Sequence, residues 1–394
     1  MALSRRFLTV ATLGTTQTLA WASSYYLLGV LAEPMSRDLG TTPSILFAAF
    51  SLALMVSAAI GPLAGKVIDR FGGKPVLLTS NVIFSLGLLG LSYANVSLVF
   101  VAWLVIGIAM GSGLYEAAFS TVVRLYGHNS RGAITGITLF AGFASTVGWP
   151  LTAWMETHLG WRGACVVWAC LHLFVALPLN LTVPKASQTP EVPKTGESES
   201  QDTEMPPAQA RRATFLLAYI FAVAWFIGTS MAAHLPHILQ ISGLSLVAAV
   251  AVAALVGPAQ VAGRLLEFGF LKRTGPMLSA RLAALAHPAA VGVLLVFGAP
   301  AAAVFAVLHG MGNGVTTIAI GTLPLILFGP KGYGRRQGML MIPARIVQAT
   351  APFLFGLCIE RWDNDALWLT AALGLTAAGA LVLLKAPTKA IQPA

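Results

Sequence analysis

The chain has 394 residues, of which 57% are hydrophobic and only 10% are charged. Soluble globular proteins carry about 25% charged residues, so this composition excludes a water-soluble domain. A formal net charge of +10 would favour a nucleic-acid partner in a soluble protein, but in a membrane protein it reflects topology, and no nucleic-acid partner is expected. Uncharged apolar runs of about 20 residues, the length that crosses a bilayer, recur along the sequence. We therefore predict an all-α polytopic membrane protein.

The first 183 residues predict six membrane-spanning helices. The first apolar run follows a short basic start and resembles a signal peptide. It is longer than the apolar core of such a peptide and carries polar residues on one helical face, so we interpret it as a span. The six predicted spans cover roughly residues 7–31, 43–64, 76–93, 98–123, 133–155 and 163–183.

Residues 184–212 differ in composition, with five prolines and no aromatic residue. Such a segment cannot bury enough apolar surface to fold, so it predicts a flexible cytoplasmic linker. Six more predicted spans follow, at roughly 213–236, 244–266, 277–298, 300–327, 338–358 and 364–385. We therefore expect twelve spans in two bundles, with domains at 1–183 and 213–394.

The distribution of basic residues predicts the orientation in the membrane. If the N-terminus is cytoplasmic, 20 of the 24 lysines and arginines lie in cytoplasmic segments or helix ends. Arg37, Arg162 and Arg361 lie on the opposite side, and Arg345 lies within a span. Basic residues are enriched in cytoplasmic loops. We expect both termini in the cytoplasm, and the inner membrane of a bacterium as the location.

Two short motifs are repeated in the second half of the chain. GKVID at 65–69 corresponds to GRLLE at 263–267, and MGSG at 110–113 corresponds to MGNG at 311–314. The two offsets, 198 and 201 residues, agree with a duplication of six helices, as in one class of secondary transporters. The four-residue spacing of Gly61 and Gly65 also predicts a bare helix face that another helix approaches closely.

The glycine-rich and charged stretch at 65–74, GKVIDRFGGK, resembles the signature loop of the major facilitator superfamily, which lies between the second and third helices. The resemblance covers essentially the whole chain and implies two pseudo-symmetric six-helix bundles that transport by alternating access. It also implies that Asp69 faces the start of the eleventh span and closes the cytoplasmic side in one state. The alternative is that these charges only end the helices at the membrane surface. The expected gating residues are Gly65, Asp69, Arg70, Gly263, Arg264 and Glu267.

Other chemistry is not expected from the motifs. Gly61 and Gly65 are separated by three residues and Val67 follows Lys66, which does not match the phosphate-loop pattern. No HExxH or GxSxG motif is present, and the three cysteines show no C-x-x-C spacing. We expect no enzyme activity, no cofactor and no metal site.

The resemblance implies that spans 1, 4, 7 and 10 line a central cavity. Each of these spans carries polar or aromatic side chains at spacings of three, four or seven, which places them on one face. A polar stripe in a membrane is costly unless it faces water, ligand or another polar stripe. The expected substrate-binding residues are Gln17, Trp21, Tyr25, Tyr115, His234, Asn313 and Thr317, together with Arg345 and Gln348. His172 and His287 receive no role, because the family places their helices away from the cavity.

Two charges, Glu116 and Arg345, lie within predicted spans. Such charges are costly and mark substrate sites, proton relays or ion pairs. Glu116 is expected to take up and release the coupling proton, and Arg345 with Gln348 to bind a carboxylate or phosphate of the substrate. The alternatives are structural: an ion pair between the two residues, hydrogen bonds from Arg345 to helix-end carbonyls, or a neutral, hydrogen-bonded Glu116.

A single arginine in the eleventh span resembles the oxalate/formate and monocarboxylate porters, although their charge in the eighth span has no counterpart here. We predict a proton-coupled carrier of a small organic anion, acting as a monomer with substrate, protons and lipid as its only partners. The alternative is proton-driven efflux of amphipathic cations. Glycines and Pro150 in the fifth span resemble the drug-antiporter signature, but Trp149 and Trp154 depart from it.

Overall fold

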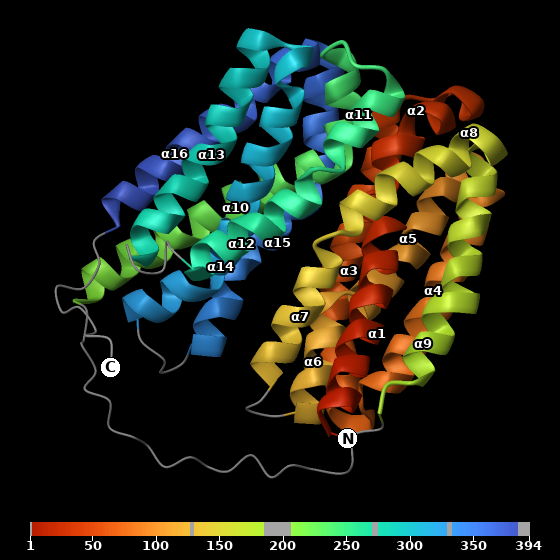
Figure 1. Ribbon diagram of the computed structural model, residues 1–394, viewed down its shortest axis with the longest axis horizontal. Coiled ribbons are helices and arrows are strands. Elements are labelled where there is room, and N and C mark those ends of the chain that lie inside the picture. Colours follow the sequence, from red (N-terminus) through yellow and green to blue (C-terminus); the bar gives the residue numbers. More distant parts are fainter. Residues whose placement is uncertain (1, 127–129, 185–205, 270–274, 329–332, 385–394) are drawn as a thin grey trace. The chain divides into compact units, whose positions relative to one another are not determined.

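The computed structural model describes the chain except for residues 1, 127–129, 185–205, 270–274, 329–332 and 385–394 (Figure 1). The described residues form helices and turns, without strands. The prediction of an all-α protein is therefore confirmed. Most of the predicted linker at 184–212 lies outside the described residues, as does Lys272 in the second copy of the loop motif.

The helices of the first half of the chain are α1 (Ala2–Ala22), α2 (Leu28–Leu39), α3 (Pro43–Phe71), α4 (Gly73–Ser92), α5 (Val96–Gly113), α6 (Tyr115–Tyr126), α7 (Arg131–Ala141), α8 (Ala144–Leu171), a π-helix (His172–Ala176) and α9 (Leu177–Leu181). Those of the second half are α10 (Pro207–Ile241), α11 (Leu246–Ala253), α12 (Val256–Gly269), α13 (Pro276–Phe297), a 3-10 turn (Ala299–Ala301), α14 (Ala302–Phe328), α15 (Tyr333–Trp362), a 3-10 turn (Asp363–Ala366) and α16 (Leu367–Leu383).

The chain divides into two compact units. The first unit comprises Met1–Glu191, Thr229–Pro258 and Ala349–Asp363, and the second comprises Val192–Gly228, Ala259–Gln348 and Asn364–Ala394. Helices α10, α12 and α15 each contribute residues to both units. The division at the linker into residues 1–183 and 213–394 is a division along the chain, and it stays a prediction.

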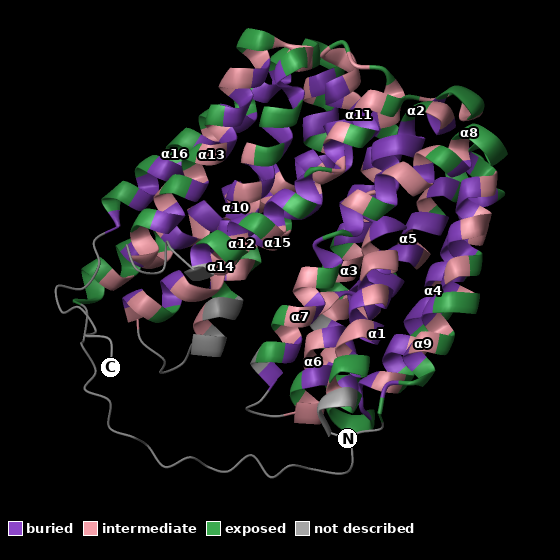
Figure 2. Cartoon of the chain, viewed as in Figure 1, coloured by how far each residue is buried: buried purple, intermediate pink, exposed green. Residues whose placement is uncertain are grey.

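The helices have the surface of a membrane protein. Nine helical stretches of the described residues are long and apolar enough to span a bilayer. Buried residues follow the faces between helices, and large apolar side chains are exposed elsewhere, including Leu86 (60%), Phe174 (74%) and Val247 (81%) (Figure 2). Such exposure is unfavourable in water and favourable in lipid. The chain is an integral membrane protein.

Two of the nine stretches, 132–181 and 339–383, are interrupted by a residue with positive φ. These residues are Gly160, with φ 69°, and Asp363, with φ 46°. The stretch from α1 to α2 is not among the nine. The number of twelve spans stays a prediction.

Several predicted spans are broken rather than continuous. The first is divided into α1 and α2 by a turn at 23–27, where the hydroxyls of Ser23 and Ser24 both donate to the carbonyl of Ala20. The fourth is divided at Leu114, the fifth at 142–143 and the eighth at 254–255. These breaks could not be predicted from apolar composition, because a broken helix and a continuous helix contain the same kinds of apolar side chain.

The signature stretch is helical for longer than the sequence predicts. Helix α3 continues past Ala64 to Phe71, and the turn is confined to Gly72, whose φ is 87°. Gly65, Asp69 and Arg70 therefore lie on the last two turns of α3 rather than in a loop. The Arg124 guanidinium donates to the carbonyls of Ile68 and Asp69 at the end of this helix.

Some glycines permit close packing between helices, but the predicted close approach at Gly61 and Gly65 is wrong. A Cβ on Gly65 would meet nothing within 4 Å, and one on Gly61 would touch only the Gly111 carbonyl at 4.0 Å. The close approach to α3 is made instead by α5, where a Cβ on Gly107 would lie 2.5 Å from the Ala53 carbonyl. In the second unit, a Cβ on Gly263 of α12 would lie 2.5 Å from the Met311 carbonyl of α14.

Candidate functional site

Three of the predicted substrate-binding residues meet in an aromatic cluster of the first unit. The Trp21 ring lies 4.3 Å from that of Tyr25 and 4.9 Å from that of Tyr115, measured between centroids. Tyr25 also packs edge-on against Phe50 of α3, at 5.6 Å. The turn after α1 and the break before α6 bring these rings together. We call Trp21, Tyr25 and Tyr115 the aromatic cluster.

Gln17 lies one turn before Trp21 and is 1% exposed. Its Nε2 donates to the carbonyl of Gly113, at 2.7 Å, where α5 ends. The Gln17 Oε1 acceptor and the Trp21 Nε1 donor are buried and have no hydrogen-bond partner among the described residues. Buried polar atoms without partners are costly, so this pair offers a ligand one acceptor and one donor.

Arg345 belongs to the second unit, together with Trp225 and Gln348. The Arg345 Nη1 donates to the Gln348 Oε1 at 3.2 Å, and its Cζ lies 5.3 Å from the Trp225 ring centroid. A guanidinium at this distance from an indole ring is attracted by the ring face. Gln348 is buried, whereas Arg345 is partly exposed. The three residues form a cationic group that can bind an anion.

The other candidates of the tenth and seventh predicted spans are in different environments. The His234 Nε2 donates to the Pro352 carbonyl at 2.8 Å, and its ring lies 3.9 Å from that of Phe47, all within the first unit. Thr317 is exposed, and its hydroxyl donates to the Gly314 carbonyl at 2.7 Å. Asn313 lines a cavity of the second unit. His309 and Thr316, which share the polar face of the tenth predicted span with Asn313, line the same cavity, and His287, to which the sequence assigned no role, lines it from α13.

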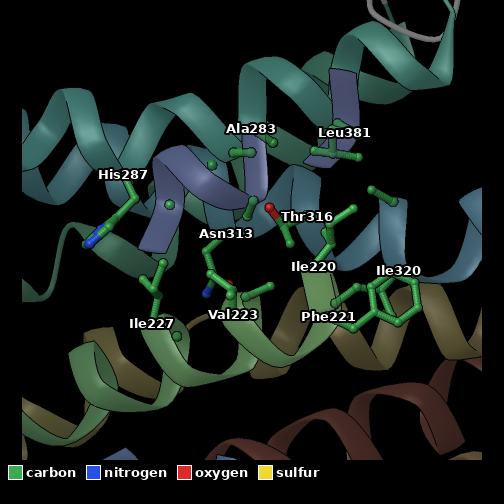
Figure 3. A pocket seen from close by; sticks show the side chains of 18 of the residues that line it. Ile220, Phe221, Val223, Ile227, Ala283, His287, Asn313, Thr316, Ile320 and Leu381 are labelled. Carbon is green, nitrogen blue, oxygen red and sulfur yellow. The ribbon is translucent and has the colours of Figure 1, made fainter. Parts of the chain in front are cut away.

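The cavity of the second unit lies between α10, α13, α14 and α16 (Figure 3). It contains about 630 Å³ of space between atoms, a figure that includes the part open to the surroundings. His287 and His309 both line it and contact each other, with 3.0 Å between their Nδ1 atoms. The sequence contains no local signal for this pair, because the two residues lie 22 positions apart on different helices.

The proposed proton carrier and the gating residues are described less fully. Glu116 lies in α6, and its side chain is outside the described set. The side chains of Asp69 and Arg70 are exposed at the end of α3. In the second copy, Arg264 is partly buried, and Glu267 is 8% exposed with its Oε2 unpaired among the described residues. The described residues contain no group of three or more side chains that could bind a metal.

Comparison with known proteins places the chain among transporters. The family model described as Major Facilitator Superfamily matches residues 13–324. The 4-hydroxybenzoate transporter PcaK of Pseudomonas putida is 27% identical over 224 residues, which are 52% of this chain and 49% of that protein. A gallate transporter of the same organism is 33% identical over 39% of this chain and 34% of that protein. The "Probable sulfoacetate transporter SauU" of Cupriavidus necator is 26% identical over 91% of this chain and 88% of that protein.

Solved structures show the same fold at low sequence identity. The nucleoside transporter NupG matches with a TM-score of 0.75 and 14% identity, covering 95% of this chain and 98% of that one. A D-xylose-proton symporter matches with a TM-score of 0.74 and 14% identity, covering 96% and 97%. The arrangement of helices is thus shared with transporters of chemically different substrates.

Proposed function

The chain belongs to the Major Facilitator Superfamily, a family of membrane transporters, and we propose that it transports a small organic carboxylate together with protons. Its relatives among anion carriers support this proposal. The names 4-hydroxybenzoate, gallate and sulfoacetate all denote molecules with a carboxylate, and a bovine monocarboxylate transporter is 30% identical over 130 residues. None of these names denotes a cation.

The group of Arg345, Gln348 and Trp225 is the observation that carries the carboxylate assignment. A guanidinium presents a planar set of N–H donors that matches the two oxygens of a carboxylate. Gln348 and Trp225 already hold the Arg345 side chain, which reduces the entropy lost when an anion binds. The carboxylate of the substrate therefore binds at Arg345.

The aromatic cluster supports a preference for carboxylates that carry a ring. Aromatic side chains pack on ligand rings with offset or edge-on geometry. The Trp21 Nε1 donor and the Gln17 Oε1 acceptor beside them suit a ring that bears a hydroxyl group. Gln17, Trp21, Tyr25 and Tyr115 are thus proposed to hold the body of the substrate. His234 and Thr317 are retained as candidate contacts, although the His234 Nε2 is already bonded to the Pro352 carbonyl, whereas Asn313 lines the cavity of the second unit.

The remaining parts of the mechanism rest on the sequence. Glu116 is proposed to carry the coupling proton, and Asp69 and Arg70 with Arg264 and Glu267 to stabilise closed states on the cytoplasmic side. The distribution of 20 of 24 basic residues supports cytoplasmic termini in a bacterial inner membrane. We propose that the chain works as a monomer by alternating access.

Uptake into proteoliposomes tests the proposal. Labelled 4-hydroxybenzoate, gallate, sulfoacetate and lactate are offered with the outside more acidic than the lumen. We expect at least one to accumulate. Replacing Arg345 by Ala is expected to raise the KM for the transported anion by about 10- to 100-fold, because a hydrogen bond to a charged group contributes about 1.5–3 kcal/mol. Arg345→Lys keeps the charge but loses the planar geometry. Its KM is expected to lie between those of the wild type and Arg345→Ala.

Arg37→Ala provides the matched control. Arg37 is exposed on α2 and pairs with Glu33 at 3.7 Å, so its loss is expected to leave the KM unchanged. Uptake of the carboxylate at the wild-type KM by Arg345→Ala would contradict the assignment. Accumulation of cationic dyes, but of none of the four anions, would contradict the carboxylate class.

A further inference from the structure

The cavity of the second unit has a composition that suits an uncharged ligand. No charged residue is among the described side chains that line it, which are mostly apolar and include Ile220, Phe221 and Leu381. The exceptions are His287 and three residues of α14, namely His309, Asn313 and Thr316. An ionised ligand would lose its hydration there without gaining an opposite charge, which is strongly unfavourable.

The three α14 residues lie on one face of that helix, since their spacings are four and three. Asn313 and Thr316 line the cavity, and no hydrogen bond joins either side chain to a described residue. Figure 3 shows both side chains in the space between α10, which carries Val223 and Ile227, and the helices across the cavity. Polar side chains in an apolar pocket fix the orientation of a ligand.

The hydrogen bonds around His287 determine which nitrogen of His309 is a donor and which is an acceptor. The Thr370 hydroxyl donates to the Leu367 carbonyl at 2.9 Å, so at 3.0 Å its oxygen accepts from the Nε2–H of His287. The Nδ1 of a neutral His287 then carries a lone pair, and His309 must donate from its own Nδ1–H across the 3.0 Å contact. The Nε2 of His309 is consequently an acceptor, and it makes no hydrogen bond to a described residue.

We propose that this cavity is a separate binding site for a small uncharged molecule with a hydroxyl group on an apolar body, such as a phenol. The hydroxyl proton is donated to His309 Nε2, and the hydroxyl oxygen accepts from both the Asn313 amide and the Thr316 hydroxyl. The apolar body packs against α10, α13 and α16. The site lies within the second unit and does not depend on the transport of a carboxylate.

Calorimetric titration of the purified full chain in detergent tests this site, with empty micelles as the blank. p-Cresol and toluene are the probes, because they have the same apolar body and differ in the hydroxyl group. We expect saturable binding of p-cresol with a dissociation constant about 10-fold lower than that of toluene. Equal affinity for the two probes, or no saturable binding of p-cresol, would overturn the proposal.

Two threonines of α14 provide a matched pair of variants. Thr316→Val removes a cavity hydroxyl, and we expect it to weaken p-cresol binding about 5-fold while leaving toluene unchanged. Thr322→Val makes the same change at a hydroxyl that is bonded to the Ile318 carbonyl and does not line the cavity, so binding is expected to be unchanged. Equal effects of the two variants would contradict the site.

Asn313→Leu fills the same space with an apolar side chain and is expected to abolish p-cresol binding. The melting temperature of each variant shows whether it is folded. If Asn313→Leu does not fold, Thr316→Val still decides the question. The titration needs no ion gradient and no anionic substrate, so a failure of carboxylate uptake and a failure of phenol binding are separate results.

Discussion

A single side chain, that of Gln17, compensates for the break between α5 and α6. In a continuous helix the Gly113 carbonyl would accept from the N–H of Ala117. Here the Ala117 N–H donates to the Leu114 carbonyl at 3.1 Å, and the Gly113 carbonyl accepts from the Gln17 Nε2 instead. The break is therefore stabilised by a residue 96 positions away. Gln17 thus has a structural contact as well as its proposed contact with substrate.

At the residue scale we predict that Gln17→Leu lowers the free energy of unfolding by about 1–3 kcal/mol, because it leaves a buried carbonyl without a donor. The measurement is the melting temperature of the purified protein. Gln240→Leu is the control, since the Gln240 amide donates to the carbonyl of Pro236 one turn back in its own helix. If the two variants melt at the same temperature, the Gly113 carbonyl does not need Gln17.

At the element scale, helix pairs in both units are held close by a glycine that faces a backbone carbonyl. Gly107 of α5 faces the Ala53 carbonyl of α3, and Gly263 of α12 faces the Met311 carbonyl of α14. Small residues at such crossings let helices pack closely in a membrane, where the hydrophobic effect does not drive helices together. Gly263 belongs to the duplicated motif, whereas its counterpart Gly65 makes no such contact.

We predict that Gly107→Ala is destabilising by about 1–3 kcal/mol, because a Cβ there would lie 2.5 Å from a backbone oxygen and force α3 and α5 apart. Gly292→Ala in α13 is the matched control. A Cβ at Gly292 would meet nothing within 4 Å, so alanine is expected to stabilise its helix by up to about 1 kcal/mol. Thermal unfolding of both variants measures the change in stability. Gly107→Ala should lower the melting temperature and Gly292→Ala should not, so a change in the same direction for both would contradict this account.

At the scale of the whole molecule, the proposed transport cycle links proton movement to substrate movement. Alternating access requires that a carrier coupled to protons accumulates substrate when a gradient is imposed and exchanges substrate without one. Glu116 is the acidic residue proposed for this coupling, and acidic side chains within membrane spans commonly serve as proton carriers.

We predict that Glu116→Gln abolishes accumulation driven by a pH gradient and retains counterflow of the same labelled carboxylate in proteoliposomes. A neutral amide has the shape of a protonated carboxyl group but cannot release a proton. Glu116→Asp, which keeps an ionisable group, is the control and is expected to retain some accumulation. Gradient-driven accumulation at the wild-type level by Glu116→Gln would rule out this role.

The sequence by itself was sufficient for the class of the molecule and much of its helical plan. Long uncharged runs require a membrane, and backbone groups in lipid must be paired within each segment, so helices follow directly. The stretch at 65–74 resembles the signature loop of the Major Facilitator Superfamily, and the match of the family model to residues 13–324 confirms the family. Periodicity also put Gln17, Trp21 and Tyr25 on one face, and the structure brings Trp21 into contact with both Tyr25 and Tyr115.

Only the tertiary structure determined where the helices break and which polar groups meet. At the break before α6, the Gln17 side chain bonds to a backbone carbonyl 96 positions away, and His287 pairs with a histidine 22 positions away. Helical spacing specifies which residues share a face, but it does not specify what packs against that face. Likewise, the sequence placed Gln348 one helical turn from Arg345, whereas the contact of Arg345 with Trp225 required the fold.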